Sequence, residues 1–109
     1  MCTVLDEDSP RPLMRIFGPG HRVTTVQELG LAGTANGALI ARLDGKYDIF
    51  VTADKNLRYQ QNLAGRILAI VELPTNRLPI LKTMTAEIAS MVESASPGSY
   101  IQVVLPTRP

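Results

Sequence analysis

The segment that most constrains the fold of this chain runs from Tyr47 to Leu57. Its centre, Ile49 to Val51, is a short apolar run of β-branched and aromatic residues, which is typical of a strand buried on both faces. Polar residues follow at once, with Asp54 and Asn56 just past the end of the run. Because ligands and catalytic groups in an open parallel sheet collect outside the carboxyl ends of the strands, we expect other acidic groups to converge on Asp54.

Length and composition indicate one soluble domain over residues 1–109. With 45% hydrophobic and 19% charged residues, the chain resembles an ordinary globular protein, and a net charge of +1 gives no case for a polyanionic partner. The single cysteine, Cys2, excludes a disulfide framework or a zinc cluster and fits a reducing compartment. No apolar run approaches the roughly 20 residues that cross a bilayer, and the N-terminus lacks a signal-peptide pattern. We therefore expect a cytoplasmic protein with no membrane partner.

The order of patterns along the chain predicts strands alternating with helices. Apolar segments predict strands over residues 3–5, 21–26, 49–51, 67–73 and 100–105. Helices are expected over about 10–17, from Thr34 or Asn36 to 43, and as a short polar helix or turn over 57–63. The longest helix should place on one buried face Leu81, Met84, Ile88, Met91, Val92 and Ala95. This alternation favours an α/β domain with a mostly parallel sheet covered on both faces.

The expected chemistry depends on where the carboxylates fall. Asp6, Glu7 and Asp8 follow the first strand, Glu28 follows the second, and Asp54 follows the central one. Because these strand ends share one edge of a parallel sheet, the carboxylates can converge on one cleft, where they stay ionised together only if a cation compensates. Oxygen ligands suit Mg²⁺ or Mn²⁺, which can polarise a phosphodiester. The alternative is that these acids are solvated turn residues or helix caps.

Several of these segments together resemble a known family. Leu5-Asp6-Glu7, Gln27-Glu28-Leu29-Gly30 and Val51 to Leu57, with Tyr59 to Gly65 and Thr75-Asn76-Arg77, resemble the PIN-like domains of bacterial proteins related to VapC-type toxin ribonucleases. The resemblance covers nearly the whole chain. It implies a three-layer α/β/α sandwich and a Mg²⁺- or Mn²⁺-dependent endoribonuclease, with RNA as substrate and an antitoxin protein as partner.

The resemblance also implies roles for individual residues. Asp6 and Asp54 match metal-binding aspartates, and Glu28 matches an acidic position, so these three are the predicted catalytic and metal-binding residues. Residues that would support them or touch substrate are Glu7, Asp8, Asn36, Thr52, Asn56 and Thr75. The chain departs from the family where an acid is common: it reads Asn36-Gly37-Ala38 at the start of the second helix and Asn56 after the central strand.

Other interpretations of the same residues stay open. With a degraded site, the domain would be an interaction module or a homodimer rather than an enzyme. A phosphoacceptor receiver domain also carries acids after the first strand and an aspartate after the third, but residues 105–108 supply no lysine after the last strand. A role for Thr52 or Thr75 in the site competes with simpler explanations, which are β-propensity for Thr52 and a turn that caps the longest helix for Thr75. Lys55, Arg58 and Arg11 can contact RNA phosphates or be scattered surface cations.

Overall fold

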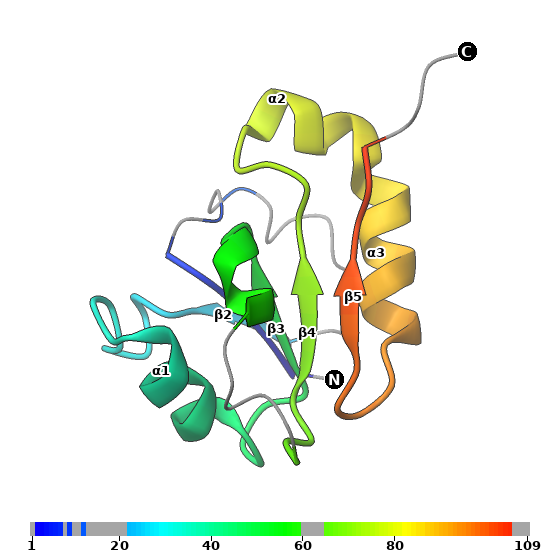
Figure 1. Ribbon diagram of the computed structural model, residues 1–109. Helices are drawn as coiled ribbons and strands as arrows, with labels where there is room; N and C mark the ends of the chain where they lie inside the picture. The colour runs from blue at the N-terminus through cyan, green and yellow to red at the C-terminus, as the bar shows by residue number, and fades with distance from the viewer. Residues whose placement is uncertain (1, 8, 10–11, 13–21, 60–64, 106–109) are drawn as a thin grey trace.

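A computed structural model describes residues 2–7, 9, 12, 22–59 and 65–105 of the chain (Figure 1). Apart from residue 12, the helix expected over residues 10–17 lies outside the described residues, as do most of the expected turn over 57–63, Asp8 and Arg11.

The described strands form one parallel sheet. They are β1 (Cys2–Leu5), β2 (Arg22–Thr25), β3 (Ile49–Thr52), β4 (Ala69–Glu72) and β5 (Tyr100–Gln102). All neighbouring pairs are parallel, and the five-stranded sheet has the order β2-β1-β3-β4-β5. β3, the segment that constrained the fold most, is fully buried and pairs with both β1 and β4. An α/β domain built on a parallel sheet is therefore confirmed.

Two strands are shorter than predicted. The apolar run over 67–73 begins outside the sheet because the backbone N–H groups of Ile67 and Leu68 both donate to Oδ1 of Asp44, at 2.9 and 2.8 Å. β5 ends at Gln102, although the apolar pattern continues to Leu105. Val104 is 73% exposed and Leu105 is 44% exposed, so these two residues lie on the surface instead of in an inner strand.

The helices follow the predicted pattern with one correction. α1 (Asn36–Leu43) buries Leu39, Ile40 and Leu43, as expected. The predicted longest helix is α3 (Thr85–Ser94), preceded by the short turns α2 (Leu78–Leu81) and η4 (Lys82–Met84), and η2 (Lys55–Tyr59) follows β3. Met91 is 40% exposed and was wrongly expected in the core. It lies at the margin of the apolar stripe that Ile88 and Val92 bury, because only part of a helix surface can face a flat sheet.

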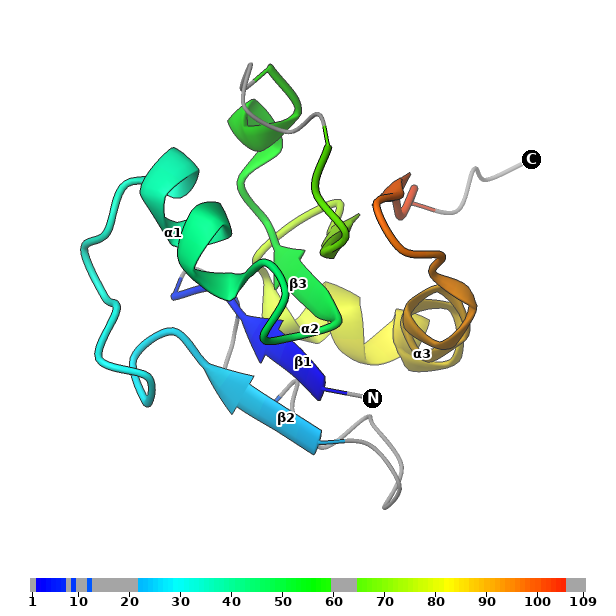
Figure 2. The same ribbon diagram turned by 90° about the horizontal axis from the view of Figure 1, so that it is seen from below.

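Two hydrophobic clusters lie on opposite faces of the sheet. One joins α3 to the side chains of Leu5, Ile49, Val51 and Val71, and the other joins α1 to Val4, Phe50 and Ile70. Successive strand residues alternate between the clusters, which is the period of two that a strand imposes on its side chains. Figure 2 shows α1 and α3 on either side of the strands. No described helix has the length and apolar character needed to span a membrane.

Candidate functional site

The face of the sheet that α1 covers changes from apolar to polar at the carboxyl ends of the strands. Val4, Phe50, Ile70 and Tyr100 lie side by side in the strand register. Two residues further along each strand the same face carries Asp6, Thr52, Glu72 and Gln102, and we call these four residues the polar row. Three of them are buried: Asp6 is 6% exposed, Thr52 0% and Glu72 2%. Buried polar groups require hydrogen-bonding partners, and each of these three side chains has at least one.

Asp6 is held at the end of β1 by two donors. The backbone N–H of Asp6 donates to the carbonyl of Val51 at 2.9 Å, so the residue continues the pairing of β1 with β3. Its carboxylate accepts the Thr52 hydroxyl on Oδ2 at 2.7 Å and the backbone N–H of Glu7 on Oδ1 at 2.8 Å. The backbone of Asp6 is thus fixed by β3, and its side chain is fixed by β3 and by the turn that follows β1.

Thr52 connects the two aspartates. While its hydroxyl donates to Asp6, the same oxygen accepts the backbone N–H of Asp54 at 3.0 Å. One buried hydroxyl therefore sets the side chain of Asp6 and the backbone of Asp54 relative to each other. Asp6 and Asp54 lie at the ends of neighbouring strands on the same edge of the sheet, as the sequence predicted.

The carboxylate of Asp54 accepts two further hydrogen bonds. Nδ2 of Asn36, the first residue of α1, donates to Oδ2 at 2.9 Å, and the backbone N–H of Asn56 donates to Oδ1 at 2.9 Å. The first bond fixes the start of α1 against the end of β3, and the second closes the turn into η2. Asn36 thus contacts Asp54 although 18 residues separate them in the chain. The role of Asn56 is carried by its backbone rather than by its side-chain amide.

No cation neutralises this pair within the described residues. Neither Asp6 nor Asp54 has a described Lys or Arg nitrogen within ion-pair distance; the ion pair that the described part contains joins Arg58 to Glu72. The described residues also contain no group of three His, Cys, Asp or Glu side chains arranged to hold a metal ion. Among the described residues, the hydrogen-bonded group around Thr52 therefore contains two carboxylates and the amide of Asn36.

Glu28 lies in a different hydrogen-bonding environment. Its backbone N–H donates to Oγ1 of Thr25 at 3.1 Å, and Oε2 accepts the Thr24 hydroxyl at 3.3 Å. The side chain is exposed. The turn after β2 thus holds Glu28 close to its own strand.

The remaining predicted residues are placed as follows. Glu7 is exposed, and its carbonyl accepts Nε2 of Gln27 at 3.4 Å. Oγ1 of Thr75 accepts the backbone N–H of Arg77 at 3.2 Å, which is the turn-forming role left open by the sequence. Asp8 lies outside the described residues.

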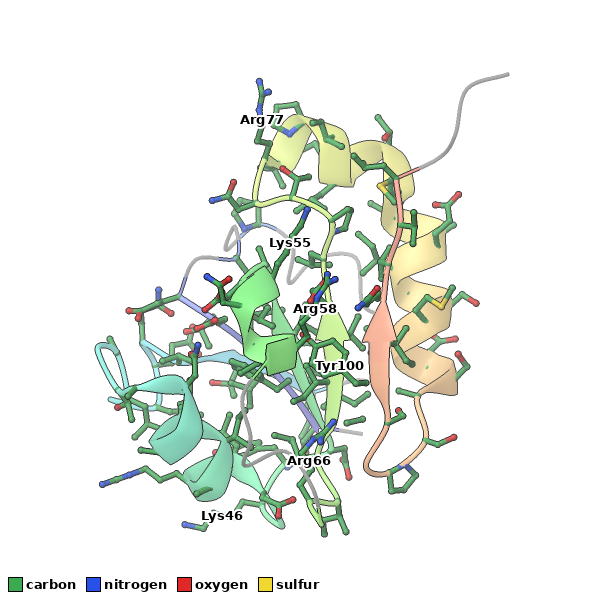
Figure 3. All side chains as sticks on the ribbon, viewed as in Figure 1. Lys46, Lys55, Arg58, Arg66, Arg77 and Tyr100 are labelled. Atoms are coloured by element: carbon green, nitrogen blue, oxygen red, sulfur yellow. The ribbon has the colours of Figure 1, made fainter. Side chains whose placement is uncertain are left out.

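Sequence analysis missed a second polar cluster beside the first. Nε of Arg58 donates to Oε1 of Glu72 at 3.1 Å, and a second guanidinium nitrogen donates to Oε2. The hydroxyl of Tyr100 donates to Oε1 of Glu72 at 2.8 Å. Burial raises the pKa of Tyr100 well above its ordinary value, and the hydrogen bond to Glu72 raises it further. Figure 3 shows Lys55, Arg58 and Tyr100 along one side of the sheet.

One sequence signal pointed to this cluster. Glu72 is the single charged residue in the apolar run over 67–73, and it falls in phase with Leu68 and Ile70. A carboxylate on the buried phase of an inner strand requires a partner. The partners, Arg58 and Tyr100, lie 14 and 28 residues away, so the sequence pattern alone does not identify them.

Comparison of the chain with models of protein families, with curated proteins and with solved structures gives no match. The structure shows a small α/β domain with an all-parallel sheet and a polar row at the carboxyl edge of that sheet.

Proposed function

We propose that this protein is a Mg²⁺- or Mn²⁺-dependent endoribonuclease with a three-layer PIN-like fold. The observation that carries the proposal is the buried Thr52 hydroxyl, which joins two aspartates at neighbouring strand ends. These ends belong to β1 and β3, between which the strand order reverses direction. In open α/β sheets, ligands bind in the crevice at such a switch point.

The donor set fits a hard divalent cation. Mg²⁺ is usually bound through one or two carboxylates, retained waters and substrate phosphate, so Asp6 and Asp54 suffice without a third acid. Each of the four carboxylate oxygens accepts one of the hydrogen bonds described above. Since a carboxylate oxygen has about two lone-pair sites, each keeps a position for a ligand. A cation bound there would act as a Lewis acid on a phosphoryl oxygen.

The residues around Asp6 and Asp54 hold the two carboxylates in place. Thr52 and the backbone N–H of Glu7 fix the carboxylate of Asp6, while Asn36 and the backbone N–H of Asn56 fix that of Asp54. Fixed donors and carboxylates hold their geometry before substrate binds, which is the preorganisation that catalysis requires. Because Asn36 is an amide where the resembled family commonly has an acid, we expect weaker metal binding than at a three-carboxylate site.

Cleavage of labelled single-stranded RNA tests the proposal. The protein should cleave RNA with millimolar Mg²⁺ or Mn²⁺ and lose the activity with EDTA. Asp54→Asn should reduce cleavage to background, because the amide keeps an oxygen for the N–H of Asn56 but lacks the charge that binds the cation. Asp48→Asn is the matched control, since Asp48 lies before β3 at the opposite end of the strand and accepts the N–H of Cys2. Cleavage that is indifferent to metal or to Asp54→Asn would contradict the proposal.

The second candidate is an interaction module with the same fold and no catalysis. Asn36 beside Asp54, and the absence of a three-acid cluster among the described residues, favour it. Titration calorimetry separates the two: binding of Mn²⁺ that Asp6→Asn abolishes supports the nuclease, and no heat at millimolar Mn²⁺ supports the module. The receiver hypothesis shares the strand order, but residues 103–105 after β5 still lack its lysine.

A further inference from the structure

A pocket lies at the carboxyl ends of β4 and β5, on the same edge of the sheet as the two aspartates. Its volume is about 290 Å³, and its lining consists of Lys55, Arg58, Glu72, Pro74, Gln102 and the segment 103–105. Ligand pockets usually span about 300 to 1,000 Å³, so this pocket is just below that range and has room for part of a ligand rather than for a large one. We call it the β4–β5 pocket.

The strand register ties the pocket to the proposed catalytic edge. Glu72 pairs with Thr52 and Gln102 pairs with Glu72, so Gln102 lies two strand spacings, about 10 Å, from Thr52. On the near side, Lys55 directly follows Asp54 in the chain. A chain of linked nucleotides bound at Asp6 and Asp54 would therefore pass into this pocket.

Two cationic side chains, Lys55 and Arg58, line the pocket. Lys55 is exposed, while Arg58 is anchored by its two bonds to Glu72, a buried residue that Tyr100 also holds. Because the pKa of Tyr100 is raised, its hydroxyl stays protonated and keeps donating to Glu72. The charge of Arg58 is paired with that of Glu72, so Lys55 is the lining cation that a phosphate can contact.

The lining also includes an apolar part that is open to solvent. Val104 is 73% exposed and Leu105 is 44% exposed, and both line the pocket beside the exposed amide of Gln102. An amide carries both donors and an acceptor and can therefore hydrogen-bond the edge of a base that rests on the aliphatic wall. The pocket therefore offers Lys55 to a phosphate, an aliphatic surface to the face of a base, and the amide of Gln102 to the edge of that base.

We propose that the β4–β5 pocket binds the nucleotide next to the scissile phosphate of a single-stranded RNA. Lys55 contacts the phosphate, Val104 and Leu105 support the base, and Gln102 hydrogen-bonds its edge. The assignment of the neighbouring scissile phosphate rests on the proposed ribonuclease function. Nucleotide binding in the pocket is independent of catalysis and is tested without metal.

The first experiment maps binding in EDTA. Uridine 5′-monophosphate and adenosine 5′-monophosphate are titrated into ¹⁵N-labelled protein, and amide shifts are followed by NMR. Saturable shifts concentrated at residues 55–58 and 102–105 are expected. Shifts confined to other regions, or none at millimolar nucleotide, would overturn the proposal.

The second experiment measures a short fluorescent oligoribonucleotide in EDTA over a range of salt concentrations. Lys55→Ala should lower the magnitude of the slope of log K against log salt by roughly 0.7, the value for one phosphate contact in a single strand. Gln102→Ala should weaken binding without changing that slope. Lys46→Ala is the matched control, because Lys46 lines pockets formed by the loop before β3 rather than the β4–β5 pocket (Figure 3), and it should leave both quantities unchanged.

The outcomes separate the two proposals. Nucleotide binding at the pocket without metal-dependent cleavage would support the pocket and contradict the ribonuclease. Cleavage whose KM and RNA affinity are unaffected by Lys55→Ala and Gln102→Ala would overturn the pocket and leave the ribonuclease standing. If sedimentation instead shows a dimer that Val104→Lys dissociates, a second copy covers the apolar wall and the nucleotide assignment fails.

Discussion

At the scale of single residues, Thr52 is central because its hydroxyl contacts both aspartates. It is fully buried, yet its hydroxyl is the donor to Asp6 and the acceptor for the N–H of Asp54. A strand threonine is ordinarily explained by β-propensity. Here its two hydrogen bonds make it the connection between β1 and the turn after β3.

Thr52→Val should destabilise the fold while keeping the side-chain shape. The substitution leaves Asp6 without its 2.7 Å donor and the N–H of Asp54 without its acceptor, at a cost of about 1–3 kcal/mol for buried groups left unsatisfied. Urea denaturation monitored by circular dichroism measures the free energy of unfolding. Thr52→Ser keeps the hydroxyl and serves as the control. A valine variant as stable as the serine variant would show that the hydroxyl does not join the two residues.

Tyr100 should give the fold a dependence on alkaline pH. Its folded-state pKa lies above the unfolded value of about 10 because burial and Glu72 disfavour the phenolate. Its contribution to stability is therefore complete below about pH 10 and is lost as the pH rises toward the folded-state pKa.

Unfolding free energies at pH about 8 and about 10.5 measure this contribution. The wild type should lose more stability over that interval than Tyr100→Phe, which lacks the ionisable hydroxyl. Equal losses in the two proteins would mean that the folded state does not perturb Tyr100.

At the scale of elements, side-chain hydrogen bonds tie the ends of β3 and β4 to elements that follow other strands. Asn36 ties the start of α1 to the end of β3, and Arg58 ties η2 to β4. Asp44, the residue after α1, ties that end of the helix to the chain entering β4. Asp54, η2 and the chain entering β4 all follow β3. Side-chain hydrogen bonds thus hold these three segments, in addition to the hydrophobic contacts of the sheet.

The asymmetry of α3 gives a prediction at this scale. Ile88 is fully buried, whereas Met91 is 40% exposed one turn further on. Ile88→Ala should cost about 2–5 kcal/mol because it opens a cavity, whereas Met91→Ala should cost about 1 kcal/mol or less, as a largely exposed change does. Urea denaturation of the two variants measures the difference, and equal costs would mean that α3 faces the sheet differently.

At the scale of the whole molecule, the parallel arrangement gathers every strand's carboxyl end at one edge. All neighbouring pairs are parallel, so the polar row and the β4–β5 pocket lie on that one edge and share Glu72 and Gln102. Both hydrophobic clusters lie behind it, one on each face of the sheet. Binding at the edge should therefore be coupled to the stability of the whole domain.

Thermal unfolding with Mn²⁺ tests this coupling. At a concentration ten times the dissociation constant, a ligand that binds the folded state alone stabilises it by about 1.4 kcal/mol, or roughly 5–10 °C in Tm for a domain of this size. The wild type and Asp48→Asn should show this rise, and Asp6→Asn should not. A rise that persists in Asp6→Asn would place the Mn²⁺ site elsewhere.

The sequence by itself determined the local elements and the class of the fold. Apolar runs with β-branched residues predicted β3 and β4, and helical spacing predicted α1 with its buried Leu39, Ile40 and Leu43. These predictions succeed because the period of buried side chains is a local property of each segment. The convergence of Asp6 and Asp54 followed from the same patterns, since parallel strands share their carboxyl edge.

The tertiary structure alone decided which side chains meet. The contact of Asn36 with Asp54, and the cluster of Glu72 with Arg58 and Tyr100, join residues far apart in the chain. Strand order and register set these contacts, and periodicity within a segment does not determine either. The exposure of Met91 and Leu105 was likewise decided by where the sheet ends and by how much of a helix it can cover.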